Sequence, residues 1–428
     1  MSEAVERRAT FRDVLTVPEF RAIWLAQAQS LVGDQLARVA LSVLVFDRTG
    51  SPALTALVYA LTFVPAILGG ILLSGMADRL PRRDLMVGCD LVRAVLVGAM
   101  ALPVVPLPVV CCLLVLAVLA GQPFLAAEAA LLPDILSGER YVVGSGLRMF
   151  TSQTAQLAGF AGGGLAVALV GARGGLAIDA GTFVVSAVLI RLLVHHRGAP
   201  ATRVTSGRRR STLGDAGAAV RFIWADRRLR TLAAIGWLAS FHVVPEALAA
   251  PYAAALGGGA REVGLLMAAP PAGTAIGVLL ILRLRAETRV RLLGPLAFLS
   301  AVPMVLCGLQ PGLAASLALW VLLGVLAAYQ VQAAASFVGL LPDERRGRVL
   351  GLVSSGMVAG QGLGIIGFGV IGQHVSAASA IAIAGLIAAG LGLALAIASH
   401  RTRFTPNPPA GADEVGGDRH SLPPVSTA

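Results

Sequence analysis

Twelve apolar runs, each long enough to cross a lipid bilayer, constrain this sequence more than any other feature. A spanning helix needs about 20 mostly apolar residues. The chain is 56% hydrophobic and 13% charged, whereas soluble proteins carry about 25% charged residues. We therefore expect an all-α membrane protein with 12 transmembrane helices. The runs cover approximately 21–46, 53–76, 85–103, 107–132, 141–170, 174–194, 230–255, 262–282, 292–309, 312–341, 349–372 and 377–399.

Polar segments divide these runs into two sets of six. The expected parts are an N-terminal six-helix half, a cytoplasmic central loop, a C-terminal six-helix half and a disordered cytoplasmic tail rich in proline: 1–194, 195–229, 230–399 and 400–428. The first run is too long for a signal-peptide core, so we expect it to remain as a spanning helix. The sequence Leu131-Leu132-Pro133-Asp134 recurs 209 residues later as Leu340-Leu341-Pro342-Asp343. Such a repeat is typical of transporters built from two related halves.

The positive charges predict the orientation in the membrane. All 34 cationic side chains are arginine. Of these, 29 would lie on one side of the membrane, three on the other (Arg48, Arg173 and Arg261) and two within helices (Arg38 and Arg93). Positive loops stay in the cytoplasm, so we expect both termini there, in the plasma or inner cell membrane. The net charge of +11 then anchors the protein to anionic lipid, and we expect no nucleic-acid partner.

Several kinds of site are excluded or disfavoured by composition. Without lysine, the chain has no Walker A phosphate loop and no lysine Schiff-base chemistry. The four cysteines lie in apolar runs without metal-ligand spacing. We expect no enzyme activity, no cofactor and no metal.

A short charged loop between the second and third runs reads SGMADRLPRR over 74–83. It resembles the loop between helices 2 and 3 of the major facilitator superfamily, commonly G-x-L-A-D-R-x-G-R-R. Asp78, Arg79, Arg82 and Arg83 match this motif, and Pro81 replaces its second glycine, as is common in drug antiporters related to macrolide and siderophore exporters.

The third run continues the resemblance to the drug-antiporter branch. Asp90 and Arg93 fit the D-x-x-R-A sequence that often follows the charged loop. Spaced i,i+3, they share a helix face and can neutralise each other, so we expect them to belong to the gate. The resemblance implies two parallel six-helix halves with the substrate site between them. It also implies that Asp78 holds the cytoplasmic gate through contacts around Arg348.

Two charged pairs fall near the middle of predicted helices. Asp34 and Arg38 are i,i+4 in the first run, and His242 and Glu246 repeat this spacing 208 residues later in the seventh. An ionised side chain at this depth costs about 3 kcal/mol, so each faces a cavity or a partner. The alternative is two structural pairs that lock the halves. Pro245 should bend the seventh helix.

The pairs predict different roles in proton coupling. Asp34 has a permanent cation one turn away and should stay ionised, as a substrate or gate contact. Glu246 has only His242 nearby, which can be neutral at pH 7. We expect Glu246 to carry the proton, with His242 as its relay and Asp34 as the other candidate.

Other polar side chains in the runs are candidates for the substrate cavity or for ion pairs. The predicted cavity set is Asp34, Gln35, Arg38, Gln153, Gln156, Gln330 and Gln332. Glu128 could pair with Arg93 or Arg148, or extend to the surface. We expect Asp179 to lie at the outer interface.

These patterns predict a secondary active transporter, a monomer in the bilayer, that exports small amphipathic molecules such as drugs, antibiotics or siderophores in exchange for protons. A metabolite importer or facilitator of the same fold is an alternative, which uptake and efflux assays on vesicles would separate. A membrane receptor or assembly partner without transport is another. A silent transport screen together with a tight binding partner would favour it.

Overall fold

The computed structural model describes residues 9–198 and 212–401. The tail 402–428 and the stretch 199–211 of the central loop, for which we predicted a cytoplasmic location, lie outside the described residues. The described part is helical and contains no strand. Its helices are α1 (Phe11–Leu15), α2 (Pro18–Thr49), α3 (Pro52–Ala60), α4 (Val64–Leu73), η1 (Ser74–Asp78), α5 (Arg82–Met100), α6 (Leu107–Ile135), α7 (Gly138–Leu193), α8 (Thr212–Ala225), α9 (Arg227–Trp237), α10 (Ala239–His242), α11 (Val244–Ala247), α12 (Ala249–Ala255), α13 (Ala260–Leu282), α14 (Ala286–Leu299), α15 (Val302–Cys307), α16 (Leu313–Ala327), α17 (Tyr329–Gly339), α18 (Asp343–His374) and α19 (Ala377–Arg401).

Local sequence explains where the first helices begin and end. Pro18 occupies the first turn of α2, where its missing N–H costs nothing. Gly50 ends α2 in the left-handed conformation at φ 59°, which glycine adopts without strain. The Ser51 hydroxyl then caps α3 by accepting a hydrogen bond from the Leu54 N–H at 3.2 Å.

Two of the predicted runs form the single long helix α7, which is broken at Gly171. Its φ of 76° and ψ of 168° are not helical, and a positive φ is favourable only for glycine. The chain therefore reverses there, and the segments before and after Gly171 correspond to the fifth and sixth predicted runs.

The predicted bend in the seventh run is confirmed. The stretch Arg227–Ala247 meets Ala249–Ala255 at 49°, three residues after Pro245. Proline lacks the N–H that would bond to the preceding turn and clashes with it. The run is divided into α9, α10, α11 and α12.

Fewer helices are long and apolar enough to span a membrane than were predicted. Among the described residues, eight are long and apolar enough, or nine if the bent pair is one span. The difference has physical causes: α2 and α5 carry several charged residues, and α7 contains two runs in one helix. All twelve runs are helical, and the number of crossings remains a prediction.

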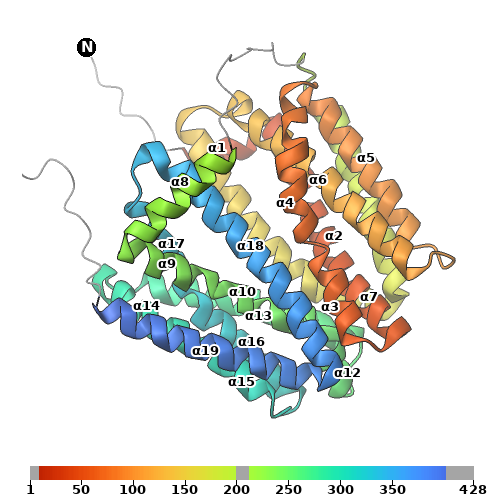
Figure 1. Cartoon of the computed structure of the whole chain (residues 1–428). Coiled ribbons are helices and arrows are strands. Elements are labelled where there is room, and N and C mark those ends of the chain that lie inside the picture. Colours follow the sequence, from red (N-terminus) through yellow and green to blue (C-terminus); the bar gives the residue numbers. More distant parts are fainter. Residues whose placement is uncertain (1–8, 199–211, 402–428) are drawn as a thin grey trace, which may run out of the picture.

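The helices pack as two groups, α2 to α7 (the first helix group) and α9 to α19 (the second), as the colours in Figure 1 show. The groups meet where α7 packs on α13 and α3 packs on α18. Gly164 and Gly264 touch there without side chains, since a Cβ on either would overlap the other's backbone. Beside the α3–α18 contact, Ser51 Oγ donates to Gln373 Oε1 at 2.7 Å.

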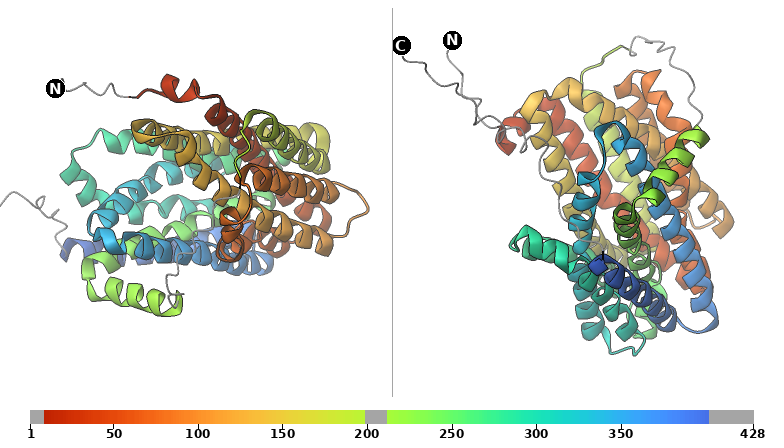
Figure 2. Two further views of the ribbon diagram at one scale, coloured as in Figure 1. Left: turned by 90° about the horizontal axis from the view of Figure 1, so that it is seen from above. Right: turned by 60° about the vertical axis from the view of Figure 1, so that its left-hand side comes forward.

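On the side of the arginine-rich loop 74–83 the two groups separate, and α18 and α4 diverge in Figure 1. A cavity of about 620 Å³ lies there between Ile67 of α4 and the helices α8, α9, α18 and α19. Figure 2 shows α8 lying along the edge of the bundle. The arrangement is thus closed on one side and open on the arginine-rich side.

Candidate functional site

A hydrogen bond joins the two helix groups at the predicted proton site. Tyr59 of α3 donates its hydroxyl to Glu246 Oε2 of α11 at 2.7 Å. The tyrosine is only 2% exposed, so the bond is shielded from water and strong. Arg38 of α2 lies above the Phe63 ring, 4.8 Å from its centroid, and its charge acts on both Tyr59 and Glu246. Sequence reasoning missed Tyr59 and Phe63, because a lone aromatic in an apolar run carries no signal of its own.

His242 is held by the second helix group and not by Glu246. Gln330 Nε2 lies 3.2 Å from His242 Nδ1, and His242 Nε2 lies 3.1 Å from Ser300 Oγ. Because the Ser300 hydroxyl already donates to the Ala297 carbonyl, it accepts from Nε2–H, and Nδ1 accepts from the glutamine amide. Both ring nitrogens are therefore used by a neutral tautomer, so the proposed relay to Glu246 has no direct hydrogen bond here and remains a prediction.

The predicted pairing of Asp34 with Arg38 is wrong. Asp34 Oδ1 accepts from Arg93 Nη2 of α5 at 2.7 Å, and the Arg93 guanidinium also stacks on the Phe183 ring at 3.9 Å. The reason is tertiary: α5 and α2 both pack on α7, which brings the buried arginine across to the neighbouring helix.

The predicted neutralisation of Arg93 by Asp90 on the same helix face is also wrong as a direct pair. Asp90 is fully buried and hydrogen-bonds to Ser186 Oγ of α7 at 2.5 Å. Its other oxygen, Oδ1, is buried without a hydrogen-bond partner. Arg93 Nε is buried and unpartnered as well.

Two further acidic residues lie inside the first helix group. Glu128 pairs with Arg148 at 2.8 Å, and its side chain is 0% exposed. The predicted pair with Arg148 is therefore confirmed, and Glu128 neither pairs with Arg93 nor extends to the surface. Asp179 is 1% exposed and lies against Gly33 in the middle of α2, so its predicted position at the outer interface is wrong. Since the chain reverses at Gly171, Asp179 lies eight residues or about 12 Å along a new helix, and counting from that glycine would have revealed its depth.

The remaining cavity candidates lie on three different helices. Gln35 of α2 is buried, and its Oε1 has no hydrogen-bond partner within the described part of the chain. Gln332 donates to Ser336 Oγ at 3.1 Å, one turn along α17. On α7, Gln153 is exposed and Gln156 is half-buried. Their role as substrate contacts remains a prediction.

In the charged loop 74–83, some residues are hydrogen-bonded to the end of α6 and others are exposed. Arg82 donates to Asp134 and to the Ala130 carbonyl at the end of α6. Asp78 and Arg79 are exposed, and among the described residues Asp78 has no hydrogen bond or ion pair. The expected contact of Asp78 with the region around Arg348 is therefore not formed here, because the two helix groups are apart on this side.

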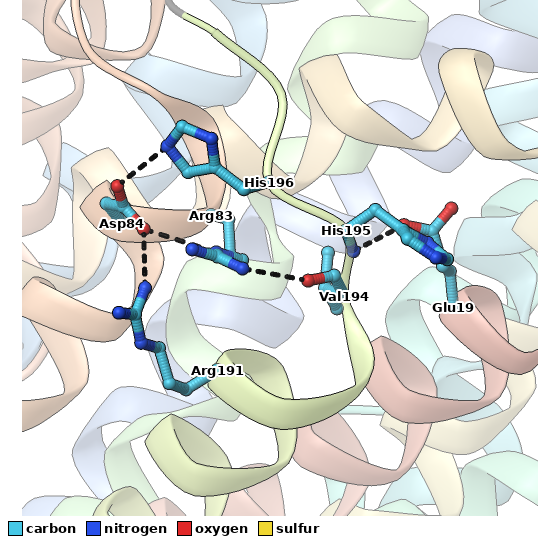
Figure 3. Close-up of polar contacts among 7 residues, drawn as sticks. All are labelled: Glu19, Arg83, Asp84, Arg191, Val194, His195 and His196. Atoms are coloured by element: carbon cyan, nitrogen blue, oxygen red, sulfur yellow. Dashed lines mark hydrogen bonds and ion pairs between the residues drawn. The ribbon is translucent and has the colours of Figure 1, made fainter.

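Sequence reasoning missed two ion-pair clusters on this arginine-rich side, which the segment after α7 connects (Figure 3). Asp84 at the start of α5 accepts from Arg83 at 3.2 Å and from Arg191 at 3.3 Å, and lies 3.2 Å from His196 Nε2. Glu19 at the start of α2 accepts a bidentate pair from Arg197 at 2.7 and 2.9 Å and the His195 N–H at 2.7 Å.

Both carboxyl groups in these clusters titrate lower than usual. Burial acts to raise the pKa of Glu19, but the hydrogen bonds from Arg197 and His195 outweigh it, and the pKa is lowered. For Asp84, burial again acts to raise the pKa, and the hydrogen bond and charge of Arg83 outweigh it. These carboxylates tie the starts of α2 and α5 to the end of α7.

Comparison with known proteins gives matches along most of the chain. The sequence profile described as Major Facilitator Superfamily matches residues 23–245 and 243–426. The enterobactin exporter EntS of Shigella boydii serotype 4 is 30% identical over 413 residues, 92% of this chain and 95% of that protein. The uncharacterized MFS-type transporter YkuC of Bacillus subtilis is 26% identical over 182 residues, 42% of each chain.

Solved structures share the fold at low sequence identity. The nucleoside transporter NupG superposes with a TM-score of 0.70 at 16% identity, over 90% of this chain and 99% of that one. A bacterial homologue of the lysosomal transporter Spinster, solved inward-facing and occupied, gives a TM-score of 0.67 at 14% identity, over 90% and 96%.

Proposed function

Because the chain belongs to the major facilitator superfamily, we propose that this multi-pass membrane transporter exports small amphipathic molecules in exchange for protons. The export would proceed by alternating access, in which the two helix groups rock around a central site. The residues proposed for the proton are Glu246 first, then His242 and Asp34. The cavity and gate residues named from the sequence keep their proposed roles.

The observation that carries this proposal is the hydrogen bond from Tyr59 to Glu246 between the two helix groups. An ionised carboxylate accepts this bond and attracts the charge of Arg38, also on the first group. A proton on Glu246 removes the charge and weakens both attractions. Protonation would therefore loosen the contact between the groups, which is the coupling that a proton-driven exporter requires.

The open cavity supports an amphipathic substrate. Its walls are mostly apolar and include Trp224 and Trp237, with Arg230 as the cation. The relative named as an enterobactin exporter favours export and places siderophores among the candidates. Drugs and antibiotics with an apolar body fit the same chemistry.

Transport by inside-out vesicles tests the proposal. With an imposed pH gradient, vesicles containing the protein should accumulate ethidium or enterobactin, and an ionophore that collapses the gradient should abolish the accumulation. Asp47→Asn, an exposed change on α2, serves as the control with unchanged transport. Accumulation only in right-side-out vesicles would identify an importer. Equilibration that ignores the gradient would identify a facilitator.

The proposed orientation has its own test. With both termini in the cytoplasm, a cysteine replacing Ser206 in the central loop should react with an impermeant maleimide only after the cells are opened. Labelling in intact cells would reverse the orientation, and with it the assignment of the arginine-rich side to the cytoplasm.

A further inference from the structure

Three carboxylates surround one buried guanidinium inside the first helix group. Asp34 is ion-paired with Arg93 at 2.7 Å, and the charges of Asp179 and Asp90 also act on Arg93. Asp90 is 0% and Asp179 1% exposed. We refer to Asp34, Asp90, Arg93 and Asp179 as the Arg93 cluster.

Neighbouring groups do not balance its charge. The adjacent Glu128 is neutralised by its own partner, Arg148, at 2.8 Å. Arg38 lies over Phe63 and beside Glu246, towards the other helix group. If all its carboxyls were ionised, the Arg93 cluster would carry two negative charges that no nearby cation among the described residues offsets.

An uncompensated buried charge is expensive. The effective cost in a protein is several kcal/mol per ion, even after relaxation. Asp90 illustrates the problem, because its Oδ1 is buried and has no hydrogen-bond partner. The cluster avoids this cost if protons bind to its carboxylates. With Asp34 ionised against Arg93, neutrality requires Asp90 and Asp179 to be carboxylic acids.

Position distinguishes Asp179 from Asp90. Asp179 and Thr182 lie against Gly33, where a Cβ would overlap the Asp179 carboxyl and the Thr182 hydroxyl. Gly33 directly precedes Asp34, whose side chain is 33% exposed. Asp179 is thus beside a carboxylate that is partly exposed, whereas Asp90 is fully buried and bound to Ser186.

We propose that Asp179 is a second proton-binding site of the transport cycle, in exchange with Asp34 through Arg93. When Arg93 pairs with Asp34, Asp179 holds the proton. When Arg93 turns to Asp179, the Asp179 O–H bond breaks, an O–H bond forms on Asp34, and that proton can leave through the exposed side of Asp34. The coupling part of this inference rests on the proposed proton-driven export, whereas the protonation of Asp179 does not.

Infrared spectroscopy of the purified protein tests the protonation without any substrate. A protonated buried carboxyl gives a C=O stretching band that shifts in heavy water. One such band should be lost in Asp179→Asn. It should also be lost in Asp34→Asn, because we expect Arg93 to turn to Asp179 and ionise it, while Asp90 stays hydrogen-bonded to Ser186. Asp47→Asn should keep the band.

If Asp179→Asn, in protein that elutes as a single folded species, keeps every protonated-carboxyl band of the wild type, the inference is overturned. If Asp179→Asn does not fold, Asp34→Asn decides alone. The C=O band assigned to Asp179 must then be absent from Asp34→Asn. Its persistence in that variant would refute the exchange.

The second measurement is the limiting accumulation of ethidium in vesicles with the membrane potential clamped at zero. Removing one of two coupled protons lowers the limiting ratio by about tenfold per unit of pH gradient. We expect this loss in Asp179→Asn. If Asp179→Asn loses the infrared band but keeps the wild-type accumulation ratio, Asp179 is protonated but takes no part in the transport cycle. If the wild type itself ignores the gradient, the proposed export fails and the infrared result still stands.

Discussion

The carboxyl groups in the middle of this protein are handled in two different ways. Glu246 lies at the contact between the helix groups, where Tyr59 donates to it at 2.7 Å. The Arg93 cluster lies within one helix group, where Arg93 is shared among three acids. Breaking the first contact affects how the groups meet, whereas breaking the second affects the fold of one group. We therefore expect Glu246 to act on the contact between the groups, and the Arg93 cluster to combine its proposed proton binding with the stability of one group.

Removal of the shared cation should have the largest effect. Arg93→Met leaves three carboxylates without a counter-charge, and losing one partner of a buried pair costs about 3–5 kcal/mol. We expect a large loss of thermal stability in detergent that worsens as the pH rises, since the acids must then remain protonated to stay buried. Arg38→Met is the matched control, because Arg38 is only half-buried. Equal losses in both variants would remove the distinction between the two regions.

Neutralising the acid between the groups should leave the fold intact. Glu246→Gln mimics the protonated form, so we predict retained substrate binding and exchange, with gradient-driven export reduced at least roughly tenfold, or about 1.4 kcal/mol. Counterflow and gradient-driven uptake in vesicles measure the two activities separately. If Glu246→Gln still concentrates substrate while Asp34→Asn does not, the proton site belongs to the first helix group alone.

Loss of the hydroxyl that binds Glu246 should have a smaller effect. Tyr59→Phe keeps the ring but removes one hydrogen bond to a carboxylate, a contribution of about 1.5–3 kcal/mol. The contact between the groups should loosen, and a cysteine pair placed across α3 and α18 should cross-link more slowly. Phe63→Leu, which keeps the hydroxyl, provides the comparison. Unchanged cross-linking in Tyr59→Phe would show that packing alone holds this side closed.

The smallest effect is expected at the arginine-rich surface. The pKa of Glu19 is lowered from its ordinary value of 4.5, so its stabilising contribution is present above that value and is lost as the pH falls through the folded-state pKa. Glu19→Gln should therefore remove part of the acid sensitivity of unfolding below about pH 5, by less than about 1 kcal/mol. Glu287→Gln, at an exposed position of α14, should not. Identical acid curves for wild type and Glu19→Gln would show that these bonds contribute nothing to stability.

The elements of the fold could be predicted from the sequence because a bilayer imposes length and apolarity on each helix. The bend near Pro245 followed from the missing amide. Partners across helices could not be predicted in this way. Spacing within one helix favoured Arg38 for Asp34, but packing brought Arg93 to it, and Tyr59 gave no sign of its role. The reversal at Gly171 lies in the gap 171–173 between the fifth and sixth predicted runs, but the contact of Asp179 with Gly33 on α2 could not be predicted from that gap.

The bare contact between Gly164 and Gly264 has a consequence for the equilibrium between states. The backbones of Gly164 and Gly264 are in direct contact, so the helix groups cannot approach each other more closely on that side. A single methyl group at either position would act as a wedge, excluding the closed form without touching any charge or substrate contact. We therefore expect the absence of two side chains to influence the balance between the proposed states of the transporter.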